Sequence, residues 1–158
     1  MATEIERKFL ITEGFSPDGE GTKYVQGYLG EGHDSVTRIR ISGDKAYLTI
    51  KGRNSGISRQ EFEYEIPVNE AEELLKLCRK PLIEKTRYHV KVGNHVWEVD
   101  EFHGANEGLW LAEIELSDEN ESFDLPDWAG KEVTGDPRYY NVNLVQKPNP
   151  ENIKPPKI

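Results

Sequence analysis

Charged residues two positions apart recur along this chain, inside segments that otherwise have the composition of β-strands. Successive side chains of a strand point to opposite faces, so residues two apart share one face. In Glu113-Ile114-Glu115, for example, both carboxylates would lie on one face and the isoleucine on the other. The charged rows comprise Glu4, Glu6 and Lys8; Arg38 and Arg40; Thr49 and Lys51; Arg59, Glu61, Glu63 and Glu65; Lys85 and Arg87; Glu98 and Asp100; and Glu113 and Glu115.

These rows carry mostly carboxylates and arginines, where an ordinary solvated strand face would be diluted by Ser and Thr. A lone pair such as Glu113 and Glu115 is usually no more than a solvated face. The rows together are different, because like charges side by side are destabilising unless charge of the opposite sign lies between them. Carboxylate oxygens suit Mg²⁺, or Mn²⁺, better than zinc. Rows of Arg and Lys suit the oxygens of a chain of two or three phosphates.

The composition is that of a folded single domain, with 158 residues, 35% hydrophobic, 31% charged and a net charge of −9. The acidic balance argues against a nucleic-acid binder, which normally has a basic face. The single cysteine, Cys78, excludes an intramolecular disulfide and is expected to be a packing residue. No apolar run approaches the roughly 20 residues of a membrane span, and the N-terminus lacks the apolar stretch of a signal peptide. We therefore expect a cytoplasmic protein without a membrane partner.

Strand-like segments alternate with short connections that have turn chemistry. We expect strands over 3–11, 23–31, 35–42, 45–52, 58–67, 82–92, 95–103 and 109–117. The sequences Ser42-Gly43-Asp44-Lys45 and Val92-Gly93-Asn94-His95 predict tight hairpins with two-residue loops. Counting back from these loops places Arg87 opposite Asp100, and Arg38 opposite Thr49. The charged residues of each hairpin therefore share one face.

Two helices are expected. The first would begin at the N-cap Asn69, with Glu72 completing a capping box, and would end before Pro81. The second would lie near 137–146, where apolar residues keep helical spacing.

The fold class that follows is α+β, mainly antiparallel β: an eight-stranded barrel or tunnel with a charged interior and a few flanking helices. The barrel domain would cover 1–147, and the Pro-rich segment 148–158 is expected to be a flexible tail. The outward-facing apolar residues would be covered by the helices, or by a second copy of the chain in a homodimer. A lipocalin-like carrier is the alternative barrel. It needs an apolar interior, whereas here the side chains that would point into the barrel are charged.

Glu4-Ile5-Glu6-Arg7-Lys8 resembles the E-x-E-x-K signature of the CYTH superfamily, the triphosphate tunnel metalloenzymes. Further elements match that family in order: Arg38-Ile39-Arg40, Thr49-Ile50-Lys51, Arg59-Gln60-Glu61-Phe62-Glu63, Glu84-Lys85-Thr86-Arg87-Tyr88, Asp100 and Glu113-Ile114-Glu115. The segment from Trp128 to Asn141 resembles the C-terminal part of the compact bacterial members. The resemblance covers about 1–146, and it implies a barrel that binds triphosphates together with a divalent metal.

The resemblance also implies a role for each matching residue. Glu4, Glu6, Glu113 and Glu115 would be metal ligands, and Glu61, Glu63 and Asp100 would bind metal directly or through water. Lys8, Arg38, Arg40, Lys51, Arg59 and Arg87 would grip phosphate oxygens. Lys85 and Tyr28 resemble a pair proposed to assist hydrolysis in the small bacterial members. The sequence leaves open whether Lys85 acts as a base or as a fixed positive charge, since neighbouring cations and anions would shift its pKa in opposite directions.

The function that these observations favour is a Mg²⁺-dependent inorganic triphosphatase that converts tripolyphosphate into pyrophosphate and phosphate, with Mn²⁺ as a second candidate metal. Its only expected ligand besides metal is a small polyanionic substrate. Within the same fold, the alternatives are a class IV adenylyl cyclase and a nucleoside or thiamine triphosphatase. A non-catalytic polyphosphate-binding module belongs to a different class. The cyclase would need a pocket for the base, and the sequence gives no signal for one.

Overall fold

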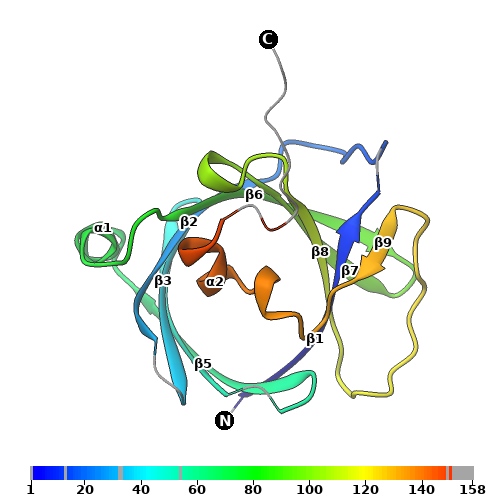
Figure 1. Cartoon of the computed structure of the whole chain (residues 1–158), viewed down its shortest axis with the longest axis horizontal. Coiled ribbons are helices and arrows are strands. Elements are labelled where there is room, and N and C mark those ends of the chain that lie inside the picture. The colour runs from blue at the N-terminus through cyan, green and yellow to red at the C-terminus, as the bar shows by residue number, and fades with distance from the viewer. Residues whose placement is uncertain (1, 13, 32–33, 54, 149, 151–158) are drawn as a thin grey trace.

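The computed structural model describes residues 2–12, 14–31, 34–53, 55–148 and 150, and in this part of the chain the strands form one antiparallel sheet that closes on itself (Figure 1). The strands are β1 (Ala2–Ile11), β2 (Thr22–Glu31), β3 (Ser35–Ser42), β4 (Lys45–Gly52), β5 (Ser58–Ile66), β6 (Ile83–Val92), β7 (His95–Phe102), β8 (Trp110–Glu115) and β9 (Ala129–Glu132). Their order is β5-β4-β3-β2-β6-β7-β8-β1-β9, and β5 also pairs with β1. The closed eight-stranded barrel predicted from the sequence is therefore confirmed.

The predicted strands are confirmed with small differences at their ends. The largest is at β8, which ends at Glu115 where the sequence predicted 117. The short strand β9 was not predicted, because it offers neither a run of alternating residues nor β-branched side chains. It pairs with β1 outside the eight-stranded ring, through Phe9 with Glu132 and Ile11 with Ala129.

Both predicted hairpins have the expected register. Gly43 and Gly93 each have a φ of 61°, the left-handed conformation that a two-residue hairpin loop requires. The pairs that face each other across the two ladders are Arg87 and Asp100, His89 and Glu98, Lys85 and Phe102, Arg38 and Thr49, and Arg40 and Tyr47. The charged rows of neighbouring strands are thereby brought to the inner surface of the barrel.

The helix α1 (Val68–Lys76) covers part of the outer surface, over β2 and β3. The predicted capping box is wrong: the N-cap is Pro67, no side chain caps the helix, and Asn69 lies inside the first turn. The proline carbonyl instead accepts the hydrogen bonds of the first turn, and this earlier start lets Val68 join the apolar cluster under the helix. Cys78 follows the helix and is buried in that cluster, which confirms its packing role.

The second predicted helix is divided in two. A 3-10 turn, η2 (Pro137–Tyr139), is followed by α2 (Asn141–Gln146), and Figure 1 shows both within the outline of the barrel. Leu144 and Val145 of α2 are buried against Tyr28, Ile83 and Phe102. One end of the barrel interior is therefore apolar and closed by the chain itself. We call η2 and α2 together the C-terminal plug.

Two further features complete the fold. A 3-10 turn, η1 (Gly104–Asn106), connects β7 to β8. Across the described residues, no helix is both long and apolar enough to cross a membrane. The predicted flexible tail lies almost wholly outside the described residues, which include only Pro148 and Pro150 of it.

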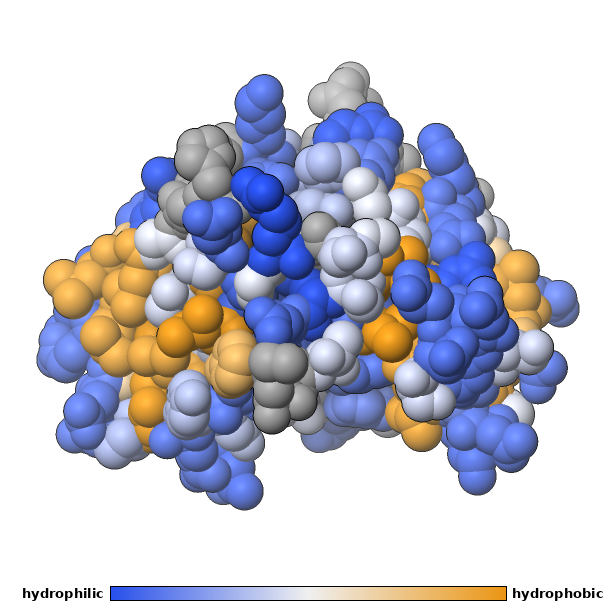
Figure 2. Space-filling model, turned by 90° about the horizontal axis from the view of Figure 1, so that it is seen from below, coloured by the Kyte–Doolittle hydropathy of each residue, from blue (hydrophilic) through white to orange (hydrophobic). Residues whose placement is uncertain are grey.

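Part of the outer apolar surface remains exposed. Ile50, Phe62 and Tyr64 on β4 and β5 have exposed fractions of 37%, 37% and 57%. Figure 2 shows apolar surface gathered on the side of the molecule where Figure 1 places α1, β3 and β5. Cover by a second copy of the chain stays a prediction.

Gly27 of β2 allows the chain after α1 to lie directly on the barrel. A Cβ at this position would be 2.7 Å from the Cβ of Cys78 and 2.8 Å from Cδ2 of Leu82. We therefore expect Gly27→Ala to lower the free energy of unfolding by about 1–3 kcal/mol through overpacking. Gly30→Ala is the matched control on the same strand, because its Cβ would meet nothing within 4 Å. Urea unfolding would measure both, and equal stability of the two variants would contradict the close contact.

Candidate active site

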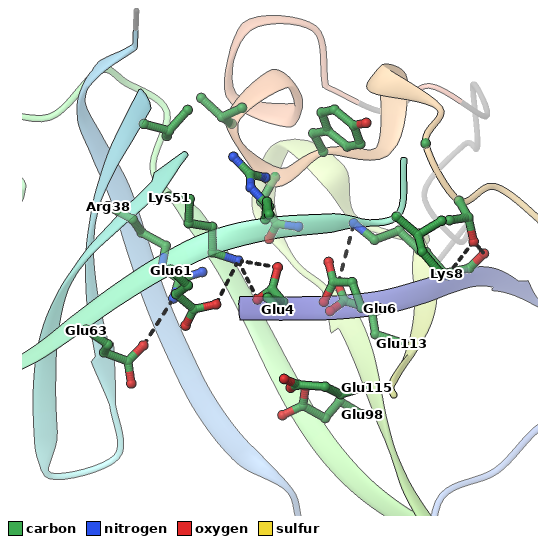
Figure 3. Close-up of a pocket in the computed structure, with 18 of the residues that line it drawn as sticks. Glu4, Glu6, Lys8, Arg38, Lys51, Glu61, Glu63, Glu98, Glu113 and Glu115 are labelled. Atoms are coloured by element: carbon green, nitrogen blue, oxygen red, sulfur yellow. Dashed lines mark hydrogen bonds and ion pairs between the residues drawn. The ribbon is translucent and has the colours of Figure 1, made fainter. Parts of the chain in front are cut away.

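The charged rows surround a cavity of about 300 Å³ inside the barrel (Figure 3). This volume is at the lower end of the range for ligand pockets, about 300–1,000 Å³. The predicted site residues that line it are Glu4, Glu6, Lys8, Tyr28, Arg38, Arg40, Lys51, Arg59, Glu61, Glu63, Lys85, Arg87, Glu113 and Glu115. Asp100 is the predicted site residue that does not. We call this space the barrel cavity.

The two signs of charge lie on different parts of the cavity wall. Strands β5, β1, β8 and β7 carry the carboxylates Glu4, Glu6, Glu61, Glu63, Glu98, Glu113 and Glu115, which we call the acidic wall. Strands β3, β4 and β6 carry most of the cations, and we call this part of the cavity the basic wall. The register sets Glu6 directly opposite Glu115, and Glu98 directly opposite Glu113. Directly opposed like charges are destabilising. The acidic wall is therefore arranged for something other than stability of the empty barrel.

The pKa values of two of these carboxyls reflect this crowding. Burial, Glu113 and Glu4 raise the pKa of Glu6 well above its ordinary value. Burial raises the pKa of Glu115, and the charges of Glu4 and Glu98 add to the effect. A bound cation would favour the ionised form of both groups and so reverse these shifts.

Lys51 lies between two acids of the same wall (Figure 3). Its Nζ is 3.0 Å from Oε2 of Glu4 and 3.8 Å from Oε2 of Glu61. A hydrogen bond with Glu4, together with burial, raises the pKa of Glu61 to about 7. Burial opposes ionisation of Glu4, but the hydrogen bond from Glu61 and the charge of Lys51 outweigh it and lower its pKa. The proton that the pair can hold is therefore on Glu61 rather than on Glu4, and it is lost as the pH rises through about 7.

Glu113 is held in its charged form. Lys8 Nζ is 3.4 Å from Oε1 of Glu113 and also donates to the backbone oxygen of Tyr139 at 3.0 Å. Burial alone would raise the pKa of Glu113, but the cations Lys8, Arg87 and Lys85 hold it well below its ordinary value. The bond to Tyr139 also ties the C-terminal plug to β1.

The residues of the acidic wall fit a hard divalent cation. The donors are carboxylate oxygens, and no His or Cys is among the described residues that line the cavity. In the described part of the chain, no group of three or more His, Cys, Asp or Glu side chains is close enough together to hold a metal ion by itself. Mg²⁺ does not require such a cage, because it commonly takes one or two carboxylates and completes its shell with water and substrate phosphate.

The basic wall has donor capacity that the protein does not use. Within the described residues, Nε of Arg38 is buried without a hydrogen-bond partner. Its Nη2 donates to Oγ1 of Thr49 at 3.2 Å and lies 3.6 Å from Glu63. Burial and the neighbouring charges of Arg38 and Arg87 lower the pKa of Arg40 to about 10. Cations crowded in this way fit a polyanionic ligand that supplies the missing acceptors.

Asp100, which was predicted to bind metal directly or through water, accepts hydrogen bonds from two cations through both of its carboxylate oxygens, and its role toward a metal stays a prediction. Oδ1 accepts from Nε of Arg87 at 2.8 Å, and Oδ2 accepts from Nη2 of Arg87 at 2.9 Å and from Nζ of Lys85 at 2.8 Å. Burial opposes its charge, but Arg87 and Lys85 lower its pKa to about 2. The side chain is 1% exposed. Asp100 orients these two cations, and both of its oxygens are already engaged.

Lys85 is buried among groups of both signs. Burial is the main cause that lowers its pKa to about 7; Asp100 opposes this shift, and the charges of Arg87 and Arg40 add to it. Tyr28 is joined to Lys85 through two amides. Its hydroxyl accepts from Nε2 of Gln26, which also donates to Asn141, and Asn141 accepts from Lys85.

Two polar residues of the cavity wall, Glu98 and Asn141, had no predicted role in the site. Glu98 was placed in a charged row with Asp100, but the family resemblance gave it no role, although its parity is that of the other inward-facing carboxylates. Asn141 had no such signal, because it reaches the cavity from the plug rather than from a strand.

A closed antiparallel barrel with a charged interior, where carboxylates face arginines and lysines, defines a class of protein that binds anions together with metal. The sequence matches the CYTH domain over residues 2–147, and the chain belongs to that family. It is 55% identical over 150 residues to an inorganic triphosphatase of Acetivibrio thermocellus, an alignment that covers 94% of this chain and 96% of the relative. It is 41% identical to an inorganic triphosphatase of Nitrosomonas europaea, covering 90% and 97%. The crystal structure of the inorganic triphosphatase NE1496 has a TM-score of 0.66 and 38% identity, covering 92% of this chain and 95% of that one.

Proposed function

We propose that this protein is an inorganic triphosphatase that hydrolyses tripolyphosphate to pyrophosphate and phosphate with Mg²⁺ as its metal. The observation that carries the proposal is the meeting of an acidic wall and a basic wall across one cavity of about 300 Å³. The cations exceed what a single phosphate needs, and the small cavity favours a substrate without a large organic group. The names of the relatives at 55% and 41% identity support the same activity.

The acidic wall would hold the metal. Glu6 lies directly opposite Glu115, Glu113 is two residues from Glu115 on β8, and Glu4, Glu61 and Glu63 extend the wall toward β4. When bound, Mg²⁺ would neutralise phosphate charge and lower the pKa of a coordinated water.

The basic wall would bind and orient the phosphate chain. Arg38, Arg40 and Arg87 supply guanidinium donors that match phosphate oxygens in geometry. Lys8, Lys51 and Arg59 lie around the same space and would contact its remaining oxygens. These charges would stabilise the transferring phosphoryl group and the pyrophosphate leaving group, which departs as the bridging P–O bond breaks.

Lys85 would take the proton of the attacking water. With a pKa lowered to about 7, its Nζ is neutral in a large fraction of molecules near pH 7 and can accept a proton there. The water oxygen forms the new bond to phosphorus as its proton passes to Nζ. Of the two roles that the sequence left open, base and fixed positive charge, the lowered pKa supports the base.

The substrate test is a phosphate-release screen. We expect kcat/KM for tripolyphosphate to exceed that for ATP and thiamine triphosphate by at least about tenfold, since phosphate contacts line the cavity and an adenine or thiamine would gain few contacts there. A chelator should abolish the activity, and Mg²⁺ should restore it, with Mn²⁺ as comparison. Cyclic AMP formation at a matching rate would contradict the assignment. A rise in melting temperature with tripolyphosphate, but no phosphate release, would indicate a binding module.

A further inference from the structure

The side chain of Asn141 connects the C-terminal plug to Lys85, the proposed base, and to Gln26. Its Oδ1 accepts from Nζ of Lys85 at 3.0 Å and from Nε2 of Gln26 at 3.1 Å. Lys85 is on β6 and Gln26 is on β2, so one amide oxygen connects three elements of the fold.

The orientation of both amides follows from their partners. Oε1 of Gln26 accepts from Nε of Arg40 at 2.9 Å, and a guanidinium can only donate. The amide nitrogen of Gln26 therefore faces Asn141, which must present its oxygen. The charged amine of Lys85 is likewise only a donor, so it requires the same orientation of Asn141.

This arrangement fixes the direction in which Lys85 can act. A neutral amine has two N–H bonds and one lone pair in tetrahedral positions. The acceptors Asp100, at 2.8 Å, and Asn141, at 3.0 Å, occupy the two N–H positions. The remaining position carries the lone pair, and Lys85 lines the barrel cavity. If one acceptor is removed, the amine can rotate and turn an N–H toward the cavity in place of its lone pair.

We propose that Asn141 is a positioning residue that, together with Asp100, directs the lone pair of Lys85 into the cavity, so that a docked C-terminal plug is a condition of hydrolysis. The inference rests on the proposed function, in which Lys85 accepts a proton. The plug takes part in that step through the Asn141 oxygen, which accepts a hydrogen bond from Lys85 and is held in place by the amide of Gln26.

The plug does not depend on Asn141 to remain in the barrel. Leu144 and Val145 have exposed fractions of 0% and 3%, and Nδ2 of Asn106 donates to the backbone oxygen of Leu144. Loss of the Asn141 amide should therefore leave α2 docked. Its effect on Lys85 can then be separated from its effect on folding.

The test compares Asn141→Leu, Asn141→Asp and the matched control Asn143→Leu. Leucine is close to asparagine in size but has no acceptor, whereas aspartate keeps an oxygen in the same place. Asn143 is on the same helix and donates to the backbone oxygen of Pro137, so its replacement also removes one side-chain hydrogen bond of the plug. The readouts are kcat, KM, the pH profile of kcat and the melting temperature, with tripolyphosphate and Mg²⁺.

We expect Asn141→Leu to lower kcat by about tenfold or more with KM changed less than about twofold, because a reacting group is misdirected while phosphate contacts remain. In Asn141→Asp, an added carboxylate beside Lys85 favours the charged amine and moves the alkaline rise of kcat to higher pH. Above that pH, kcat should recover toward the wild-type value. The charged groups that face Lys85 in all variants are Asp100, Glu113, Arg87 and Arg40.

The outcomes separate this inference from the function on which it rests. An inactive wild-type protein would refute the proposed function itself. With an active wild type, wild-type kcat in Asn141→Leu would overturn the positioning role, as would an Asn141→Asp profile that does not move. A kcat loss in Asn143→Leu equal to that in Asn141→Leu would assign the effect to the stability of the plug, and would also overturn the role. If Asn141→Leu fails to fold, the pH profile of Asn141→Asp decides.

Discussion

Replacement of Lys85 by alanine is expected to lower kcat by more than about a hundredfold, because it removes the group that we propose accepts the proton of water. Lys85→Arg should be nearly as inactive, since arginine keeps the positive charge but cannot release its proton. Lys23→Ala, on the exposed face of β2, is the control and should keep wild-type turnover. Steady-state phosphate release measures all three variants. Near-normal turnover in Lys85→Arg would remove the base role and leave Lys85 as a fixed positive charge.

The pH dependence adds a second measurement of the same role. Since burial and the neighbouring arginines lower the pKa of Lys85 to about 7, kcat should rise with pH through that value and level off above it. Lys85→Arg should lose this rise. Mg²⁺ and substrate would shift the midpoint in opposite directions. Glu61, whose pKa is also raised to about 7, titrates in the same range, so the part of the rise that Lys85→Arg removes is the part due to Lys85.

The lowered pKa of Lys85 should also make the free energy of unfolding depend on pH. The ordinary pKa of lysine, 10.5, describes the unfolded chain, and the folded value is about 7. Between these values the unfolded state binds the extra proton, so the free energy of unfolding rises with pH across that window. Lys85→Met, which keeps most of the buried volume, should show a smaller rise. Equal pH dependence in the two proteins would mean that Lys85 keeps an ordinary pKa when folded.

Much of the barrel could be predicted from strand parity. A shift of register by one residue moves every charge of a strand to the other face, so a chain with charged rows has few acceptable registers. The loops at Gly43 and Gly93 then fixed two of the ladders. This is why the pairing of Arg87 with Asp100 could be stated from sequence and was confirmed.

Parity could not show how each charge is used. Asp100 has the same inward parity as the carboxylates of the acidic wall, but the ladder places it where Arg87 and Lys85 take both of its oxygens. Whether a carboxylate faces the cavity or two cations depends on its height along the barrel axis. That height follows from the stagger of all the strands, which no single hairpin determines.

The helix predicted near 137–146 was found, but its division into η2 and α2 and its place inside the barrel could not be predicted from the sequence. The helix α2 has only six residues, and it is stable only because the barrel encloses it. The position of Asn141 beside Lys85 depends on this tertiary packing. In the same way, α1 begins after Pro67 because Val68 packs under it, and this contact overrides the better capping residue Asn69.

Glu6→Gln and Glu115→Gln are each expected to lower kcat by about tenfold to a hundredfold while the metal-free protein melts at the same or a higher temperature. The two carboxyls oppose each other across β1 and β8, and their raised pKa values fit the proposed site, which would bind metal at the cost of repulsion in the metal-free barrel. In wild type, Mg²⁺ should raise the melting temperature, and the raised pKa values mean that this rise should increase with pH. Both variants should show a smaller rise with Mg²⁺.

Two comparisons make this expectation specific to the acidic wall. Glu4→Gln should also impair turnover but should not gain stability, since Glu4 pairs with Lys51 at 3.0 Å and removing its charge leaves that cation with a weaker partner. Glu72→Gln, on the exposed face of α1, should change neither turnover nor the response to Mg²⁺. If Glu6→Gln and Glu115→Gln melt at clearly lower temperatures yet turn over normally when folded, these acids are structural, and the metal must be bound elsewhere on the cavity wall.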